Sequence, residues 1–362
     1  MTKSVSTTRT PPPTPFPAVR IVTGEAFELV AELSAFTSGP ARGSLDSGKL
    51  WVREVRALAG PELVKRVEQF GLNVYAELAT IALEAAEPRG VGELLAAIGA
   101  MGADAFRRRL LGVDSTMTRS MVSDGAIERA IGGDAAARTE IRSTFGYDRA
   151  ARLAIDRLLE PSAVGLLEEV AGIVRAWEDR VYPRFAPDAQ EAVTREVALR
   201  TEQLEGSGEE LVKVATGGVA YQPPAWIRAI VLVPVVAIRP FVIPMELRDT
   251  ALFLASVADE AFETDPAAPP RQLVKVAAAL GDERRLRVLY VLRDGELSAT
   301  EIAERLGVDR TSLHHHLGIL RSAGLLAIRD DGVAGWRYAL KAGGWGEISS
   351  TLDGYLRTPG RQ

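Results

Sequence analysis

The three histidines of the chain are consecutive, His314 to His316, and Arg310 and Thr311 stand just before them. Neighbouring residues of an α-helix diverge by about 100°, so three adjacent imidazoles cannot hold one metal ion. An arginine on an exposed helix face can instead make bidentate contacts with guanine, and hydroxyl groups can meet base edges or phosphates. These residue types therefore predict contact with double-stranded DNA and no metal site.

Two predicted helices position these side chains. Ser298 is a candidate N-cap, and Glu301 follows three residues later, as in a capping box. Gly307 suits the left-handed turn that ends a helix, and Asp309 is the expected cap of the next one. That second helix has leucines at i, i+4 and i+7, namely Leu313, Leu317 and Leu320. Two helices joined by a tight turn form a helix-turn-helix pattern.

With these leucines facing the core, Thr311, His315 and Gly318 point away from it, with Arg310 and His314 to the side. Gly318 would let DNA approach the helix backbone closely, and His316 is expected to be half-buried. Ser312 lies in the first turn, where helix N–H groups favour a phosphate. The predicted DNA-binding residues of this helix are Arg310, Thr311, Ser312, His314 and His315.

A predicted β-hairpin follows this helix directly. Residues 325–328 and 336–340 flank the turn sequence RDDGVAG, which is the pattern of a wing. Arg329 and Arg337 are placed for minor-groove or phosphate contact. The two aspartates at the tip oppose this interpretation, because they would repel phosphate.

Residues 271–340 resemble the ArsR-type family of bacterial transcriptional repressors. The resemblance is carried by LGDERRLRVLYVLRDGELSATEIAERLGVDRTSLHHHLGILRSAGLL and by the wing ending GWRYAL. It implies a homodimer that binds operator DNA, and an effector that weakens this binding. Metal-sensing members carry paired cysteines or Asp/His clusters. This sequence has neither, so metal sensing by those routes is not expected.

The region before this unit is predicted to be almost entirely helical from Gly24 to about Gly217. Two apolar runs, 227–233 and 250–257, then predict strands that pair back on each other, although a buried helix fits the second run equally. The segments GEAFELVAEL and IVLVP make this region similar to the helical domain that precedes the helix-turn-helix in some ArsR-like regulators. The expected fold class is mainly α: a helical N-terminal domain with a short β-hairpin, then a winged helix-turn-helix.

Composition shifts divide the chain. We expect a disordered tail at 1–20, a helical sensing or assembly domain at 21–263, and a linker at 264–270. The winged helix-turn-helix would span 271–341, and a C-terminal helix and tail 342–362. The last helix, predicted at 345–356, would either form the dimer interface or cover the winged domain.

Charge and residue usage set further bounds. Residues 271–362 contain 14 Lys and Arg against 11 Asp and Glu, whereas residues 1–270 contain 29 against 37. A less acidic C-terminal end suits a regulator that contacts DNA locally. The chain has no cysteine, which is compatible with a reducing cytoplasm. The longest apolar run is interrupted by Pro234, so no membrane span is expected.

The N-terminal region lacks the usual catalytic residues. It has no histidine or cysteine, which excludes Ser-His-Asp and Cys-His arrangements there, although catalysis by Asp, Glu or Lys remains open. The run Arg107 to Arg109 is either an anion site or a solvated helix face. Five aromatic residues are candidates for an effector pocket or for the core: Trp51, Trp177, Tyr182, Tyr221 and Trp226.

Together these features predict a sequence-specific DNA-binding repressor of ArsR type, without enzymatic activity or cofactor. Its homodimer would contact two half-sites about one helical turn apart. Its N-terminal domain would sense a small-molecule effector or set the assembly. The alternative is an enzyme or small-molecule-binding protein that uses the winged helix for protein contacts. A positive, exposed helix around Arg310, His314 and His315 would favour DNA, and an apolar or buried one would not.

Overall fold

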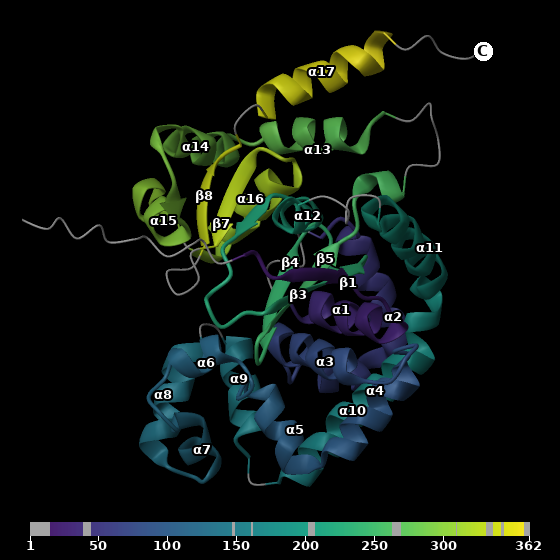
Figure 1. Cartoon of the computed structure of the whole chain (residues 1–362), viewed down its shortest axis with the longest axis vertical. Coiled ribbons are helices and arrows are strands. Elements are labelled where there is room, and N and C mark those ends of the chain that lie inside the picture. Colours follow the sequence, from purple (N-terminus) through teal and green to yellow (C-terminus); the bar gives the residue numbers. More distant parts are fainter. Residues whose placement is uncertain are drawn as a thin grey trace, which may run out of the picture.

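The computed structural model describes residues 15–38, 45–146, 149–160, 162–201, 207–262, 269–308, 310–330, 336–341 and 344–357. Helices dominate the described chain, which confirms the predicted mainly α class, and two four-stranded sheets accompany them (Figure 1). A helical body forms the lower part of Figure 1, and the winged helix lies above it.

The helical body is built around α1, which is buried on every side. Phe27, Leu29 and Val30 point to different sides of the helix, and all three are buried. Such burial on all sides is typical of a helix in the centre of a protein. The helix α2 contains a kink at Gly60 (φ 73°), directly before Pro61, where the sequence predicts a new helix. The long helices are α1 (Glu25–Thr37), α2 (Gly48–Val67), α3 (Leu72–Glu84), α4 (Val91–Met101), α5 (Ala103–Leu110), α10 (Ala163–Arg180) and α11 (Tyr182–Thr201).

Two buried glutamates tie α1 to its neighbours. The Glu28 carboxylate accepts hydrogen bonds from the backbone N–H groups of Val236 (2.7 Å) and Ala237 (2.8 Å). Burial raises the pKa of Glu28 to about 7, against these hydrogen bonds. One turn later, Glu32 accepts a hydrogen bond from the indole of Trp177 (2.7 Å), and burial together with the charge of Glu28 raises its pKa. Trp177 is therefore a core residue.

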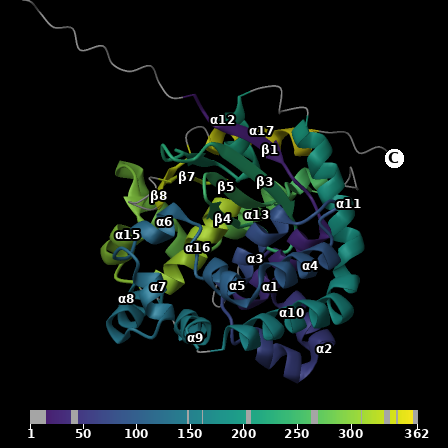
Figure 2. The same ribbon diagram turned by 60° about the horizontal axis from the view of Figure 1, so that its bottom comes forward.

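A lobe of short helices projects from the body. It lies at the lower left of Figure 1, below the wing strands, and Figure 2 shows it from beneath. Its helices are α6 (Thr116–Ser120), α7 (Ala126–Ile131), α8 (Ala135–Phe145) and α9 (Arg149–Leu158), and α12 (Gly208–Ala215) lies apart from the lobe beside β2.

The arginine run that precedes the lobe is not a solvated helix face. Arg109 is 5% exposed and forms ion pairs of 2.8 Å with both Glu84 and Asp114. Arg107 is buried as well, and Arg108 pairs with Glu128. The prediction of a solvated face is therefore wrong for two of the three arginines, because this side of α5 packs into the body.

The first sheet has the order β1-β3-β5-β4. The predicted hairpin between the two apolar runs is wrong, because β3 and β5 are parallel neighbours. The segment between these two runs supplies β4, which pairs antiparallel to β5. The strand β1 also includes residues 18–20 of the predicted tail. The strands are β1 (Ala18–Ile21), β3 (Ala229–Val235), β4 (Val242–Leu247) and β5 (Thr250–Ser256).

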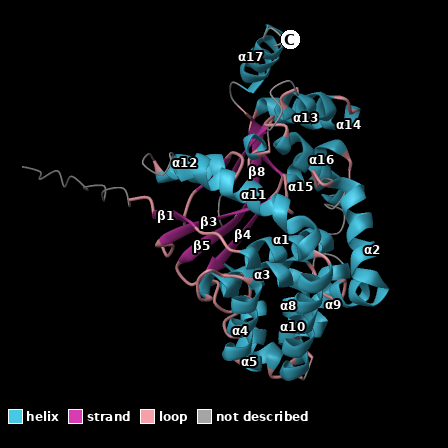
Figure 3. Ribbon diagram, turned by 90° about the vertical axis from the view of Figure 1, so that its right-hand side faces the viewer, coloured by secondary structure: helices cyan, strands magenta, loops and turns pink. Residues whose placement is uncertain are grey.

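The C-terminal part has the predicted order of two helices, a helix-turn-helix, a wing and a final helix. Its elements are α13 (Arg271–Leu280), α14 (Glu283–Val291), β6 (Leu297–Ser298), α15 (Ala299–Leu306), α16 (Arg310–Ser322), β7 (Leu326–Asp330), β8 (Trp336–Leu340) and α17 (Gly344–Arg357). Short 3-10 turns occur at Asp259–Ala261 and Leu292–Asp294. The helix α17 packs on α13 at the far end of the molecule from α5 (Figure 3).

The wing sheet includes a strand from the preceding region. β2 (Val219–Tyr221) pairs parallel with β7, with Val219 opposite Ile328 and Tyr221 opposite Asp330. One cluster of buried residues joins Leu211 of α12 to Leu313 and other core residues of the winged helix. The winged helix thus shares a sheet and a core with residues before the linker. Most of that linker, residues 264–268, lies outside the described part, and the domain boundary at 264–270 stays a prediction.

Candidate nucleic-acid interface

Both ends of the helix α15 are built as the sequence predicts. The Ser298 hydroxyl accepts a hydrogen bond from the backbone N–H of Glu301 (3.3 Å), and the Glu301 carboxylate accepts one from the backbone N–H of Ser298 (2.7 Å). This capping box begins α15, and Gly307 (φ 64°) ends it in the left-handed conformation. Asp309, the predicted cap of α16, lies outside the described residues.

The helix α16 packs on the winged helix through the predicted leucines. Leu313, Leu317 and Leu320 are each no more than 2% exposed. His314 is exposed and His315 is half-buried, so both lie outside that apolar seam. Arg310, Thr311 and Ser312 form the first turn of α16, but the positions of their side chains are not among those described. The described part of the predicted DNA face is therefore His314 and His315.

His315 contributes hydrogen bonding rather than charge. Burial lowers the pKa of His315, and the nearby Arg285 acts in the same direction. His316 is 7% exposed, so it is more buried than predicted, and burial lowers its pKa too. At neutral pH these imidazoles are neutral, and each ring then has one donor and one acceptor nitrogen. Such groups can recognise base edges, but they add little electrostatic attraction to phosphate.

The far half of the helix is covered, contrary to the prediction for Gly318. A Cβ atom placed on Gly318 would stand 2.6 Å from the ring of Phe241, just before β4. Figure 2 shows α16 running toward β4 and the helical body. DNA cannot approach the backbone at Gly318 in this arrangement. Among the described residues of the first two turns of α16, His314 is the exposed one.

One turn beyond Gly318, the side chain of Arg321 is also buried. Its guanidinium donates a hydrogen bond to the carbonyl of Thr216 (2.7 Å), and it lies 5.9 Å from the centre of the Trp336 ring. Burial lowers the pKa of Arg321 to about 10, so it remains charged at neutral pH. Arg321 links α16 to the chain before β2 and to the wing.

Both predicted wing arginines lie beside glutamates. Arg329 of β7 forms an ion pair of 2.9 Å with Glu296, and Arg337 of β8 donates a hydrogen bond to the Glu296 carbonyl (2.9 Å). Arg337 also lies 3.6 Å from Glu301. The acids reduce the positive potential that these side chains would present to phosphate. The wing tip, residues 331–335, is outside the described part.

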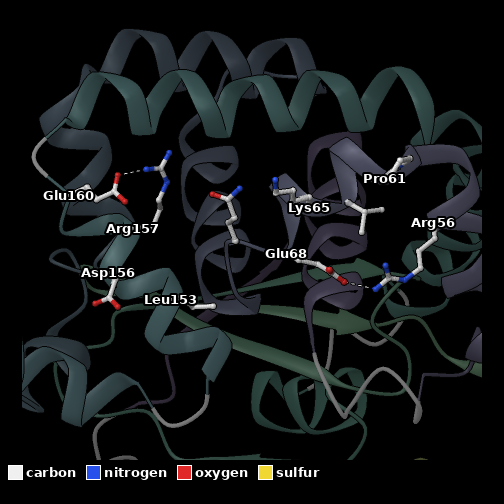
Figure 4. Close-up of a pocket in the computed structure, with 10 residues that line it drawn as sticks. Arg56, Pro61, Lys65, Glu68, Leu153, Asp156, Arg157 and Glu160 are labelled. Atoms are coloured by element: carbon white, nitrogen blue, oxygen red, sulfur yellow. Dashed lines mark hydrogen bonds and ion pairs between the residues drawn. The ribbon is translucent and has the colours of Figure 1, made fainter.

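Two cavities lie outside this face. One of about 610 Å³ lies between α2 and α9 and is lined by charged residues that pair with one another, such as Arg56 with Glu68 and Arg157 with Glu160 (Figure 4). The other, of about 570 Å³, is mostly apolar, and Tyr221 and Trp336 line it. Of the predicted pocket aromatics, Tyr221 is the one that reaches this cavity. Trp51, Trp177 and Tyr182 belong to the core, and Trp226 donates a hydrogen bond to Glu246 (3.2 Å).

The described part of the chain contains no cluster of three or more His, Asp or Glu arranged to hold a metal ion. It also contains no helix long and apolar enough to cross a membrane. Trp336 was not predicted to line a pocket, because its strand pattern indicated only that it belongs to the wing.

Residues 282–327 match the family model described as "Bacterial regulatory protein, arsR family". These residues form an ArsR-family helix-turn-helix domain. The match begins at the N-cap of α14 and ends within β7, so it contains the capping box, α15 and the whole of α16. The ArsR-type domain thus includes each described residue of the predicted recognition helix.

Similar proteins share this segment. The HTH-type transcriptional regulator KmtR of Mycobacterium tuberculosis is 42% identical over 60 residues, which are 17% of this chain and 46% of KmtR. The transcriptional activator HlyU of Vibrio cholerae is 40% identical over 58 residues, 16% of this chain and 54% of HlyU. The transcriptional repressor SdpR of Bacillus subtilis is 35% identical over 52 residues, 14% of this chain and 58% of SdpR. The chain spans about half the length of these relatives.

Proposed function

We propose that this protein is a sequence-specific DNA-binding transcriptional regulator of ArsR type that acts as a repressor, not as an enzyme. The observation that supports this most is the ArsR-type helix pair, whose second helix keeps His314 exposed, outside the protein core. Side chains at the N-terminal end of such a helix are those that read bases in the major groove. DNA as the partner would place the protein in the cytoplasm.

In this proposal, Arg310, His314 and His315 read base edges, while Thr311 and Ser312 meet phosphate or base edges. Arg329 and Arg337 hold the DNA backbone from the wing. The exposure of His314 favours this function over the alternative of a winged helix that serves only protein contacts. The helical region before the winged helix would bind a small-molecule effector, since it forms most of the wall of the apolar cavity of about 570 Å³.

A homodimer would align two such helices on DNA. The helix α17 supports this part of the proposal, since Trp345, Leu352 and Leu356 are 52%, 45% and 69% exposed. On the neighbouring helices, Val274 of α13 and Tyr290 of α14 are exposed as well. Apolar side chains gathered on one end of a protein mark an association surface. A second copy that buries this end would set the spacing of the half-sites.

The test is a fluorescence-anisotropy titration with duplex DNA from upstream of the protein's own gene and with a shuffled duplex. We expect saturable binding that is at least about 1000-fold tighter for the upstream duplex and that weakens with salt. Replacing Arg310 by Ala should reduce the preference for the upstream duplex, whereas Arg337→Ala should weaken binding to both. Equal binding to both duplexes by the unmodified protein would contradict the proposal.

A further inference from the structure

The apolar cavity lined by Tyr221 and Trp336 lies where three parts of the chain meet. Its walls are α3 and α5 of the body, the short helices of the lobe, and strands β4 and β5. Three aromatic residues from different strands line it as well: Tyr221 of β2, Phe253 of β5 and Trp336 of β8. A volume of about 570 Å³ is within the range of small-molecule sites.

The charges around this cavity have one sign. Among the described residues that line it, Glu77 and Glu246 are the charged ones, and no Lys, Arg or His joins them. Glu246 accepts hydrogen bonds from the backbone N–H of Thr116 (2.5 Å) and from the indole of Trp226 (3.2 Å), so its oxygens hold the start of α6. No described residue donates a hydrogen bond to the carboxylate of Glu77.

We propose that this cavity binds a hydrophobic organic cation, with Glu77 as the counter-ion and Tyr221, Phe253 and Trp336 as its aromatic wall. Aromatic faces attract cations, and the apolar helices would cover the rest of the molecule. A hydrophobic anion would meet two carboxylates and no cation within the lining, so it is disfavoured. The regulatory consequence drawn below rests on the proposed DNA-binding function, but the binding itself does not.

The environment of Glu77 supports a cationic ligand. Burial raises the pKa of Glu77 to about 8, while the charge of Arg109 opposes this rise and that of Asp114 adds to it. An acid that lies against apolar walls without a hydrogen-bond donor is costly to ionise while the cavity is empty. A cation that enters beside it supplies the missing charge, so the ligand and the ionised carboxylate stabilise each other.

The aromatic wall connects the cavity to the wing. Trp336 is the first residue of β8, opposite Asp330 of β7 in the hairpin. Tyr221 ends β2, which pairs with β7 at the same position, and its ring lies edge-on to Phe253 with centroids 5.0 Å apart. A ligand against Trp336 and Tyr221 therefore contacts both the wing and the strand that extends its sheet. Its binding would shift the wing relative to α16 and weaken DNA binding.

Matched ions of the same shape test the charge preference. Tetraphenylphosphonium and tetraphenylborate would each be titrated into the full chain by calorimetry. We expect the cation to bind at least about tenfold more tightly than the anion. Glu77→Gln should reduce the affinity for the cation by about tenfold or more, and Glu62→Gln, on the exposed side of α2, should not. Equal binding of the two ions, failure of the cation to bind, or an unchanged affinity in Glu77→Gln would overturn the proposal.

Two further measurements test the position of the bound cation and its effect on DNA binding separately. The cation should quench tryptophan fluorescence, and Trp336→Phe should remove most of the quenching; quenching that persists in this variant would place the cation elsewhere and overturn the assignment. The cation should also release upstream DNA in the anisotropy assay. If the cation binds with the expected dependence on Glu77 but the protein binds no DNA, the proposed function fails while the cation site stands.

Discussion

Phe241 and Gly318 lie in direct contact, with the aromatic ring occupying the place where a side chain on the helix would stand. Gly318 is in the middle of α16, and Phe241 precedes β4 of the body. The contact holds the far half of the recognition helix against the region proposed to sense an effector. The contact also limits the size of the side chain at position 318, because a larger residue would overlap the ring of Phe241.

Gly318→Ala tests this contact. Alanine favours a helix interior by about 1 kcal/mol over glycine. The overlap with Phe241 should outweigh this gain, because overpacking a filled site costs about 1–3 kcal/mol. We expect a lower free energy of unfolding in urea. Gly99→Ala on α4 is the matched control, since a Cβ there meets nothing within 4 Å, and it should stabilise the protein. Combining Gly318→Ala with Phe241→Leu should recover part of the loss, and strictly additive effects would argue against the contact.

The buried acid Glu28 predicts how stability depends on pH. Its pKa rises from 4.5 to about 7 on folding, so between these values the folded state holds a proton that the unfolded state has lost. The contribution of this group is therefore fully present below pH 4.5 and is lost as the pH rises through 7, by roughly 3 kcal/mol. Urea denaturation between pH 5 and 8 should show this decline.

The control for this decline is Glu28→Gln, which removes the titrating group. We expect the variant to be less stable than the parent at every pH, since an amide has one oxygen to accept the two N–H groups of Val236 and Ala237. Its stability should nevertheless fall less steeply between pH 5 and 8. A slope identical to that of the parent would show that other groups, such as Glu32, cause the decline.

Glu296→Gln tests whether the wing arginines are restrained by their acidic neighbours. The substitution removes the ion pair with Arg329 and one negative charge near the proposed DNA face. We expect affinity for upstream DNA to rise several-fold. If Arg329 gains a phosphate contact, the slope of log affinity against log salt should steepen by about 0.9. Arg329→Ala should change both quantities in the opposite sense, and Glu62→Gln should change neither.

The shared sheet predicts that the chain unfolds as one unit. Because β2 pairs with β7 and Leu211 lies in one cluster with Leu313, the winged helix cannot lose its structure without exposing the body. Calorimetry should give a single transition whose calorimetric and van't Hoff enthalpies agree. Two separated transitions would show instead that the predicted linker divides independent domains.

Local signals explain which features the sequence could predict. The capping box of Ser298, the turn at Gly307 and the leucines of α16 depend on residues within one or two turns, and the structure contains all of them. The described part of the region from Gly24 to Gly217 is also almost entirely helical, as predicted. Caps, turn glycines and apolar spacing depend on interactions between residues that are close together in the sequence.

Pairings between distant segments could not be predicted in this way. Nothing near β3 shows that its neighbour is parallel β5, since strand pairing depends on the path of the intervening chain. The ring over Gly318 belongs to a residue far away in sequence, so the exposed-face prediction for that position was wrong. Trp336 likewise fits the pattern of a wing strand, and only the folded chain shows that it lines a cavity.

The pairing of β2 with β7 has a consequence for biosynthesis. A ribosome that has completed β2 must add about a hundred residues before β7 exists, which takes roughly 5–20 s at typical elongation rates. During that interval the nascent body has an unpaired strand and part of its apolar core without a partner. Codon usage and chaperone supply over this stretch should therefore influence the yield of native protein, and a prematurely terminated product that lacks the wing should be prone to aggregation.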